Sequence, residues 1–251
     1  RDYYLHARTL FHLIDLAFKR LTRKPRNSSR SMYLERGVAS VDGEIILADG
    51  EEYFAVQPER LLGIFLTAQI KNLEFSEEVQ RTVHACLHLI DDGVRRSPMT
   101  RDILLKILKR KHRTAQTLRR LNDLGVLGAY LPEFGGLTCL VQYDIYHIYT
   151  VDEHTLVALE NLEALEQREG AMSSILAEFE RRDLLYLSVL LHDVGKWKRD
   201  DHIAHGIEMT RELSERMGLA EDERAMLLFL VEHHQDMVLI SRRRDLDDYE
   251  M

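Results

Sequence analysis

The pair His192-Asp193 is the part of this sequence whose residue types could do chemistry. It ends an apolar stretch, Leu184 to Leu191, and a charged segment follows it. A titratable pair at the end of a buried helix costs free energy unless something binds it, and a divalent metal ion commonly does. Five of the 12 histidines lie at or after residue 192, and His147 and His154 lie shortly before it. This crowding predicts a metal-dependent hydrolytic site.

The candidate ligands combine imidazole and carboxylate side chains. In chain order they are His154, His192, Asp193, His202, His233, His234 and Asp245. Nitrogen and oxygen donors together favour manganese or iron, with zinc or magnesium as alternatives, because magnesium alone prefers oxygen ligands. Adjacent His and Asp residues let one side chain bind an ion while the next reaches a second ion, an arrangement that activates water for attack on phosphorus. One ion and two ions are both consistent with the pattern.

The helices that would carry these residues follow from the spacing of apolar side chains. After a break at 131–136, four helices are predicted in the second half of the chain. They cover about 150–168, opened by a capping box of Thr150 and Glu153; about 182–192; a stretch around 207–217 closed by Gly218; and 221–234, with three acids in its first turn. We place a domain boundary after Gly136.

The first half is predicted to be helical with one small β-hairpin. Helical spacing covers 2–21, an exposed loop covers 22–32, and helical patterns resume at Pro58. Between them, Glu44 to Leu47 and Tyr53 to Val56 flank Asp49-Gly50, which is typical of a hairpin. The predicted fold class is therefore mainly α: a helical domain with a small β-hairpin over 1–136, followed by an all-helical domain over 137–251.

Composition excludes several classes of protein. The 251 residues carry a net charge of −8, so nothing global favours nucleic acid or an anionic membrane as a partner. No apolar run reaches the roughly 18 residues that span a bilayer. The two cysteines favour reduced thiols in a cytoplasmic setting. The chain begins at Arg1 inside a helical pattern and stops at Met251 where another begins, so we expect a C-terminally truncated piece of a longer protein.

A basic stretch stands out between Arg101 and Arg120. It holds eight Lys or Arg residues and one acid, Asp102, with apolar residues interleaved at helical spacing. This pattern is typical of a solvated helix with one buried stripe. A docking surface for an acidic domain or a nucleotide is the alternative.

A distant His154, the His192-Asp193 doublet and a late Asp245 together resemble the HD phosphohydrolase superfamily. His202-x-x-x-Gly206 and His233-His234 resemble the additional ligands of its binuclear members. A closer resemblance, to the bifunctional uridylyltransferase/uridylyl-removing enzymes, covers nearly the whole chain. It is carried by Tyr143 to Thr155 (YDIYHIYTVDEHT), Leu124 to Gly135 (LGVLGAYLPEFG), Val231 to His234 and Arg243 to Asp245.

In that family a nucleotidyltransferase domain adds UMP to a tyrosine of the PII signalling protein, the HD domain removes it, and ACT domains sense glutamine. The resemblance therefore implies metal-dependent phosphodiester hydrolysis that releases UMP from uridylylated PII, by an HD domain over 137–251 behind a helical linker over 1–136. The chain has no Gly-Ser followed by paired aspartates, so no nucleotidyltransferase site is expected in it. The expected partners are uridylylated PII and the transferase and ACT domains of the same polypeptide.

Two other functions remain open at this point. HD domains also hydrolyse nucleotides and cyclic dinucleotides, and the His233-His234 doublet resembles that binuclear branch. The other is a non-catalytic regulatory helical module whose metal site is structural or empty.

Roles follow for the residues around the doublet. Asp193 and Lys196 are the catalytic candidates, because an ammonium beside a metal could steady a phosphate oxygen or protonate a leaving group. A surface lysine is the alternative for Lys196. Arg243 and Arg244 could bind a substrate phosphate, or belong to a solvated helix face.

Two ligand assignments have alternatives, and one further histidine is expected to lie outside the site. Asp248 lies one helical turn after Asp245 and could replace it as the last ligand. Adjacent residues of a helix point about 100° apart, which favours His234 over His233. His205 is expected to be exposed to solvent.

Overall fold

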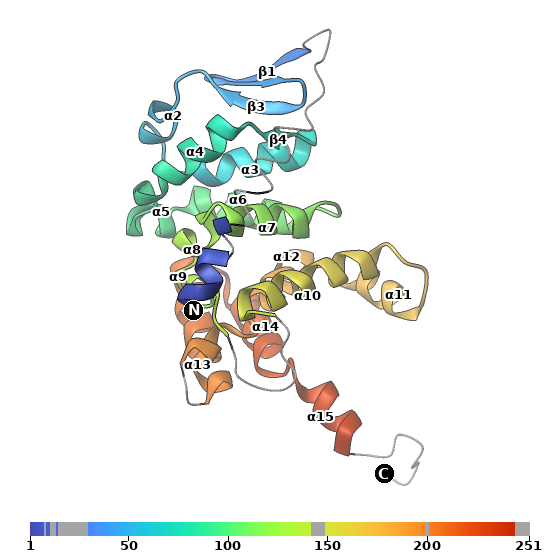
Figure 1. The fold of residues 1–251 in the computed structure, drawn as a ribbon. Coiled ribbons are helices and arrows are strands. Elements are labelled where there is room, and N and C mark those ends of the chain that lie inside the picture. The colour runs from blue at the N-terminus through green and yellow to red at the C-terminus, as the bar shows by residue number, and fades with distance from the viewer. Residues whose placement is uncertain (8, 11–13, 15–29, 142–148, 199–200, 244–251) are drawn as a thin grey trace.

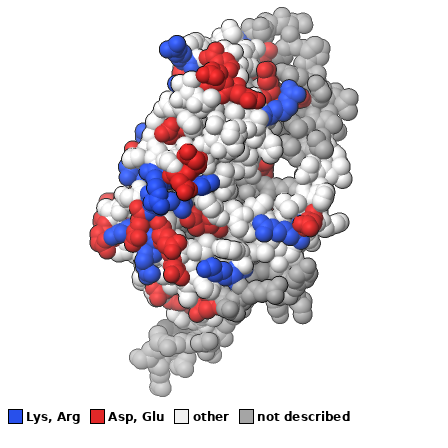
Figure 2. Space-filling model, turned by 90° about the vertical axis from the view of Figure 1, so that its left-hand side faces the viewer, with Lys and Arg blue, Asp and Glu red and all other residues white. Residues whose placement is uncertain are grey.

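The computed structural model describes residues 1–251 except 8, 11–13, 15–29, 142–148, 199–200 and 244–251. A small sheet lies at one end of the molecule, the helices that follow it form the middle, and the helices after residue 150 form the other end (Figure 1). Among the described residues, no helix is long and apolar enough to cross a membrane. The face shown in Figure 2 carries acidic and basic side chains intermingled, as expected for a solvated surface.

The sheet has four strands in the order β1-β2-β3-β4. They are β1 (Ser31–Glu35), β2 (Val38–Val41), β3 (Glu44–Leu47) and β4 (Glu74–Phe75). The first three pair antiparallel, and β4 pairs parallel with β3. The turn between β2 and β3 is Asp42-Gly43, with φ of 53° and 85°. Such a pair of positive φ angles is typical of a two-residue hairpin turn.

The predicted hairpin around Asp49-Gly50 is therefore wrong in its second half. β3 is a strand as expected, but it pairs with β2, and the residues after Gly50 form helix α2 (Glu52–Ala55). Tyr53 and Phe54 are both buried. Neighbouring strand residues point to opposite faces, so a helical turn buries these two rings on one side where a strand would not.

The middle of the molecule consists of short helices around an apolar core. They are α3 (Arg60–Lys71), α4 (Glu77–Ala85), α5 (Asp92–Arg96), α6 (Pro98–Lys109), α7 (Thr114–Asp123), α8 (Val126–Tyr130) and α9 (Pro132–Gly135), with the 3₁₀ turn η1 (Leu87–Leu89). The basic stretch covers most of α6 and most of α7. In α6 one stripe is buried, through Ile103, Leu104, Ile107 and Leu108, as the amphipathic pattern predicts.

The C-terminal end is entirely helical in its described residues. It consists of α10 (Val151–Glu166), α11 (Ala171–Glu178), α12 (Arg182–Leu191), η2 (Val194–Trp197), α13 (His202–Arg216), α14 (Glu221–Glu232) and α15 (Asp236–Arg243). Four of these match the predicted helices closely, and Gly218 closes α13 with a φ of 63°. Thr150 is the N-cap of α10, but its side chain makes no capping bond. The predicted capping box is wrong because Glu153 instead binds Arg119.

One hydrophobic core runs through both halves of the chain. Buried side chains from α3 to α14 belong to a single cluster. The halves approach closely where Gly136 meets Trp197, since a methyl group on Gly136 would lie 3.2 Å from Cγ of the Trp197 side chain. The boundary after Gly136 stays a prediction, but the two halves share one core across it.

Candidate metal centre

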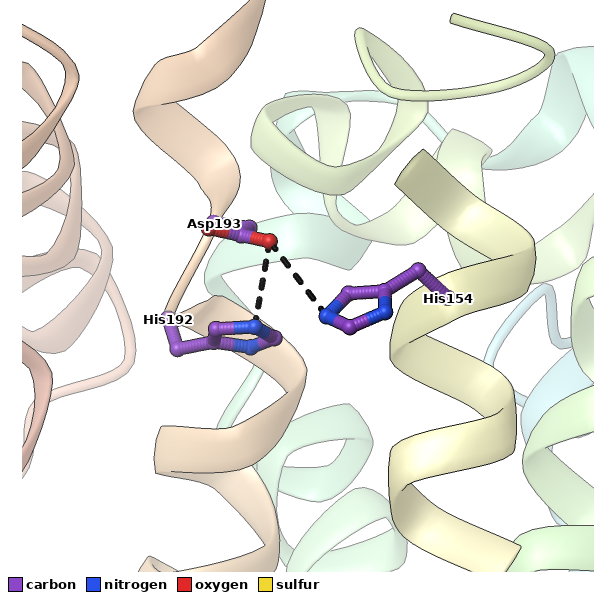
Figure 3. A group of neighbouring side chains, drawn as sticks. All are labelled: His154, His192 and Asp193. Carbon is purple, nitrogen blue, oxygen red and sulfur yellow. Dashed lines mark ion pairs between the residues drawn. The ribbon is translucent and has the colours of Figure 1, made fainter. Parts of the chain in front are cut away.

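His154, His192 and Asp193 meet at one point of the C-terminal end (Figure 3). Each offers one ligand atom, and these atoms all lie within 4.8 Å of one another. His192 Nε2 is 3.1 Å and His154 Nε2 is 3.8 Å from Asp193 Oδ2. The structure therefore brings together residues that the sequence separates by almost 40 positions.

Packing of α10 against α12 explains this convergence. Leu156 and Leu159 of α10 and Leu187 and Leu190 of α12 are buried in the common core. His154 lies in the first turn of α10, and His192-Asp193 immediately follows the last turn of α12. Since the start of one helix adjoins the end of the other, the three ligands face each other.

Two histidine rings are oriented by backbone carbonyl groups. His192 Nδ1 lies 2.7 Å from the carbonyl oxygen of Val189, and His234 Nδ1 lies 2.7 Å from that of Val231. A carbonyl oxygen only accepts, so each Nδ1 carries the proton and donates. In a neutral ring held in this way Nε2 keeps its lone pair, which is how metal-binding histidines are normally oriented.

Several buried polar atoms at this point have no hydrogen-bond partner among the described residues. They are both carboxylate oxygens of Asp193 and the Nε2 atoms of His202 and His234. Buried polar atoms in proteins are nearly always paired. Unpartnered atoms of this kind, with a donor set of imidazole and carboxylate, fit a divalent transition-metal ion.

The carboxyl group of Asp193 is almost fully buried, and charged neighbours keep it ionised. Burial alone would raise its pKa, but contact with His192 and then the ammonium of Lys196 outweighs burial and holds the pKa well below its usual range. Lys196 Nζ lies 2.9 Å from Asp193 Oδ2, and the lysine side chain is only 11% exposed. Lys196 is thus not a solvated surface lysine. Its catalytic role stays a proposal.

His234 adjoins the cluster on the side of α14. Its ring centroid lies 5.2 Å from that of His192. Burial lowers the pKa of His234, although the hydrogen bond to Val231 and the charge of Asp193 oppose this shift. A lowered pKa favours the neutral imidazole, which is the form that binds metal.

His202 reaches this region because of Gly195. A methyl group on Gly195 would lie 2.0 Å from the carbonyl oxygen of His202 and 2.6 Å from the backbone nitrogen of Gly206. Only glycine permits this approach of η2 to the first turn of α13. Asp201 caps that helix by accepting a 3.2 Å bond from the amide of Ala204.

The other candidate residues are placed elsewhere or lie outside the description. His233 is exposed, with its Nδ1 2.7 Å from Asp236 Oδ2 and its ring centroid 4.5 Å from that of Phe229. His205 is partly buried rather than fully exposed. His147, Arg244, Asp245 and Asp248 lie outside the described residues, as does the side chain of Arg243. The roles predicted for Arg243, Arg244, Asp245 and Asp248 stay predictions.

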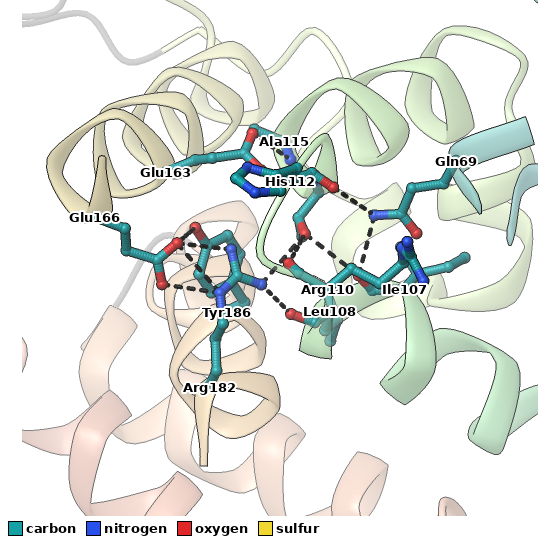
Figure 4. A network of polar contacts seen from close by, with 11 residues as sticks. Gln69, Ile107, Leu108, Arg110, His112, Ala115, Glu163, Glu166, Arg182 and Tyr186 are labelled. Carbon is teal, nitrogen blue, oxygen red and sulfur yellow. Dashed lines mark hydrogen bonds and ion pairs between the residues drawn. The ribbon is translucent and has the colours of Figure 1, made fainter. Parts of the chain in front are cut away.

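At the opposite end of α10 and α12, a polar network ties both helices to α6 and α7 (Figure 4). Arg182 donates to both oxygens of Glu166, at 2.8 Å from Nε to Oε1 and 2.8 Å from Nη2 to Oε2. It also donates to the carbonyl oxygen of Leu108, and its guanidinium lies 3.8 Å from the ring centroid of Tyr186. Glu163 accepts a 2.8 Å bond from the amide of Thr114 at the start of α7. Sequence spacing gave no signal for these contacts, because the partners lie up to 74 positions apart.

Comparison with known proteins matches two families to this chain. The family described as "Uridylyltransferase GlnD third domain" matches residues 40–130, and the HD domain family matches residues 151–250. A bifunctional uridylyltransferase/uridylyl-removing enzyme of Ruegeria pomeroyi is 35% identical over 87% of this chain and 25% of its own length. One of Cereibacter sphaeroides is 32% identical over 99% of this chain and 28% of its own length. The chain therefore spans about a quarter of these relatives.

A solved structure shares the fold. It is described as a "tRNA-processing enzyme (apo form I)", with a TM-score of 0.56 over 81% of this chain and 47% of that chain. Sequence identity is 16%, so this likeness bears on the fold alone.

Proposed function

Because the chain belongs to the family of bifunctional uridylyltransferase/uridylyl-removing enzymes, we propose that it hydrolyses a phosphodiester with the help of a divalent metal ion and releases UMP from a uridylylated tyrosine of PII. Residues 137–251 act as the HD domain, and residues 1–136 are the helical segment between transferase and HD domains. The transferase and ACT domains of the same polypeptide, and PII itself, are the proposed partners.

One observation carries this proposal: the convergence of His154, His192 and Asp193 around buried polar atoms that lack partners. These three residues would hold a divalent cation, manganese or iron by donor type, and His202 and His234 would complete the site or hold a second ion. Such a cation supplies Lewis-acid activation of water and of the phosphoryl group.

The chain's own residues have separate tasks in this proposal. Asp193 stays ionised, which keeps the buried centre attractive to a cation. The ammonium of Lys196, held beside it at 2.9 Å, stabilises negative charge that develops on a phosphate oxygen. The leaving tyrosine has a pKa of about 10 in its free form, so it departs with little help from a general acid.

The direct test combines His192→Ala with Asp193→Ala and measures release of UMP from uridylylated PII. We expect release to be abolished while the far-ultraviolet circular dichroism stays helical, because two of three ligands are gone. The matched control is His233→Ala, whose side chain is exposed and bound to Asp236, and which should retain release. Undiminished release in the double variant would refute the proposal.

A second candidate is hydrolysis of other phosphodiesters, such as nucleotides or cyclic dinucleotides. The buried, unpartnered Nε2 atoms of His202 and His234 favour it, because they offer ligands for a second ion. A panel of phosphodiester substrates separates the two: preference for uridylylated PII over cyclic dinucleotides supports the first, and the reverse supports the second.

A non-catalytic regulatory module is the remaining alternative. Elemental analysis of the purified protein, together with the substrate panel, distinguishes it. A bound transition metal without turnover of any phosphodiester would favour this alternative.

A further inference from the structure

Arg119 of α7 holds two acids of α10 at once. Its Nη2 lies 2.8 Å from Oε1 of Glu153 and its Nη1 lies 2.9 Å from Oε2, a two-pronged contact. Its Nε lies 2.6 Å from Oε1 of Glu160. The arginine side chain is 29% exposed. Because the guanidinium is planar and binds with paired bonds, this contact fixes direction as well as distance.

The contact falls on the turn that carries a predicted metal ligand. Glu153 immediately precedes His154 in the first turn of α10. The first turn of a helix has backbone amides without intrahelical partners and depends on caps or neighbours. Thr150 makes no side-chain cap here, so contacts with other segments hold this turn: the amide of Val151 donates to the carbonyl oxygen of Leu140 at 2.9 Å, and Arg119 binds Glu153.

His154 is also the most exposed of the three ligands. Its side chain is 43% exposed, whereas those of His192 and Asp193 are 15% and 2% exposed. Its distance to Asp193 Oδ2, 3.8 Å, is the longer of the two histidine distances. The position of the α10 first turn therefore decides whether the third ligand meets the other two.

The network at the far end of α10 cannot do this task. Glu163 and Glu166 tie the last turns of the helix to Thr114 and Arg182, which sets where the helix lies. Glu166 is twelve residues from His154, and at 1.5 Å per residue that is about 18 Å along the axis. Contacts that far along the helix do not fix its first turn, so other contacts must hold that turn.

We propose that Arg119 is a positioning residue for the metal ligand His154, so that the helical region before the HD domain takes part in metal binding. The proposal rests on the metal site proposed above. Two sites linked in this way affect each other equally. If the α7–α10 contact strengthens metal binding by some factor, metal binding strengthens that contact by the same factor.

The experiment measures the dissociation constant for Mn²⁺ by titration calorimetry on the whole chain. Arg119→Gln should weaken binding by about tenfold, at the low end of the range for residues that orient metal ligands. Arg119→Lys keeps the charge but loses the two-pronged contact, and should lie between. Far-ultraviolet circular dichroism and thermal unfolding check that each variant is folded.

The sign of the effect separates positioning from simple electrostatics. Removing a positive charge near a cation site would tighten cation binding, whereas loss of positioning weakens it. The matched control is Arg120→Gln, on the same helix, which removes an arginine bound to Glu74 and to the carbonyl oxygen of Leu73. It should leave the Mn²⁺ dissociation constant within about twofold.

Three results would contradict the inference. Equal or tighter Mn²⁺ binding by folded Arg119→Gln would overturn the positioning role and leave the metal site standing. Equal weakening by Arg120→Gln would show a general effect of α7 and overturn it too. Failure of the unaltered chain to bind Mn²⁺, Fe²⁺ or Zn²⁺ would overturn the metal site and the inference together.

Discussion

At one end of the α10–α12 pair, Glu166 accepts bonds from Arg182 and from the hydroxyl of Tyr186, at 2.8 and 2.9 Å. At the other end, the buried carboxylate of Asp193 pairs with Lys196 at 2.9 Å, while Nε2 of His202 and Nε2 of His234 have no hydrogen-bond partner among the described residues. Both ends contain buried charge close to helix ends. The first satisfies its polar groups within the protein and joins α10 and α12 to α6 and α7. The second leaves ligand atoms free toward a common centre.

The difference indicates how structural and ligand-binding clusters can be told apart. A buried charge that the protein itself satisfies contributes rigidity, whereas a buried set left incomplete costs stability until a ligand completes it. We therefore expect the end with the Arg182–Glu166 contact (the network end) to set the free energy of unfolding. The end with His154, His192 and Asp193 (the histidine end) should set the affinity for metal.

The largest expected effect comes from breaking the network with Arg182→Met. This change leaves Glu166, whose side chain is 18% exposed, without its cation, and removal of one partner of a buried pair costs about 3–5 kcal/mol. Urea unfolding measures this loss in the free energy of unfolding. The control Arg224→Met removes an arginine that binds the exposed Glu215 and Glu221 and should cost below about 1 kcal/mol.

If Arg182→Met cost no more than Arg224→Met, the network would not be the stabilising end. If the folded Arg182→Met protein lost Mn²⁺ affinity more than about tenfold, the two ends would not be separable.

The next effect concerns the histidine end, where we expect a large loss of metal affinity and little loss of stability. His154→Gln removes a partly exposed ligand and should weaken Mn²⁺ binding by more than about 100-fold, since loss of a ligand exceeds loss of a group that orients one. The free energy of unfolding without metal should change by less than about 1 kcal/mol. Calorimetry and urea unfolding of the same preparation give both values.

His233→Gln is the matched control for this variant. It also removes a histidine, but one that contacts Asp236 and Phe229, and its Mn²⁺ affinity should equal that of the unaltered chain. Equal losses in the two variants would place His233 among the ligands and contradict the site described here.

The smallest effect appears at high pH and belongs to the network end. Burial raises the pKa of Tyr186 well above its ordinary value of 10, and its bond to Glu166 adds to this. Above pH 10 the unfolded chain loses the proton that the folded chain keeps, so stability falls as pH rises, by about 1.4 kcal/mol per pH unit. Below pH 10 both states keep the proton and the dependence vanishes.

Tyr186→Phe should therefore flatten the decline of unfolding free energy between pH 10 and 11, at a cost of about 1 kcal/mol near pH 7 for the lost hydrogen bond. Tyr33→Phe, with an exposed ring, should leave the slope unchanged. An unaltered slope in Tyr186→Phe would show that this tyrosine is ionised in the folded protein.

Local signals predicted the helices well and one turn badly. Apolar spacing and Gly218 located the helices of the C-terminal half because those signals act within one or two turns. Two Asp-Gly pairs, Asp42-Gly43 and Asp49-Gly50, stand on either side of the strand Glu44–Leu47, and each is a hairpin signal. The choice between them depended on burial of Tyr53 and Phe54 together in the core, which is a tertiary event.

The sequence likewise predicted part of the metal cluster, and the tertiary structure decided the rest. Residue types and the resemblance of His154, His192 and Asp193 to a family pattern predicted a set that the structure brings together. The outward contact of His233 and the close approach of Gly195 to His202 depend on how η2, α13 and the end of α14 pack, and spacing along the chain does not encode that packing.

By itself, the sequence determined the kind of chemistry available to this protein and the helices that carry it, because residue types and apolar periodicity are local properties. The tertiary structure alone decided which polar groups find partners. Arg182 meets Glu166 and Arg119 meets Glu153 across gaps of 16 and 34 residues, while the buried carboxylate of Asp193 pairs with Lys196, three residues away, and lies 3.8 Å from Nε2 of His154. The physical reason is that burial and pairing depend on atoms brought together from distant positions, and the free energy of a charge depends on those atoms.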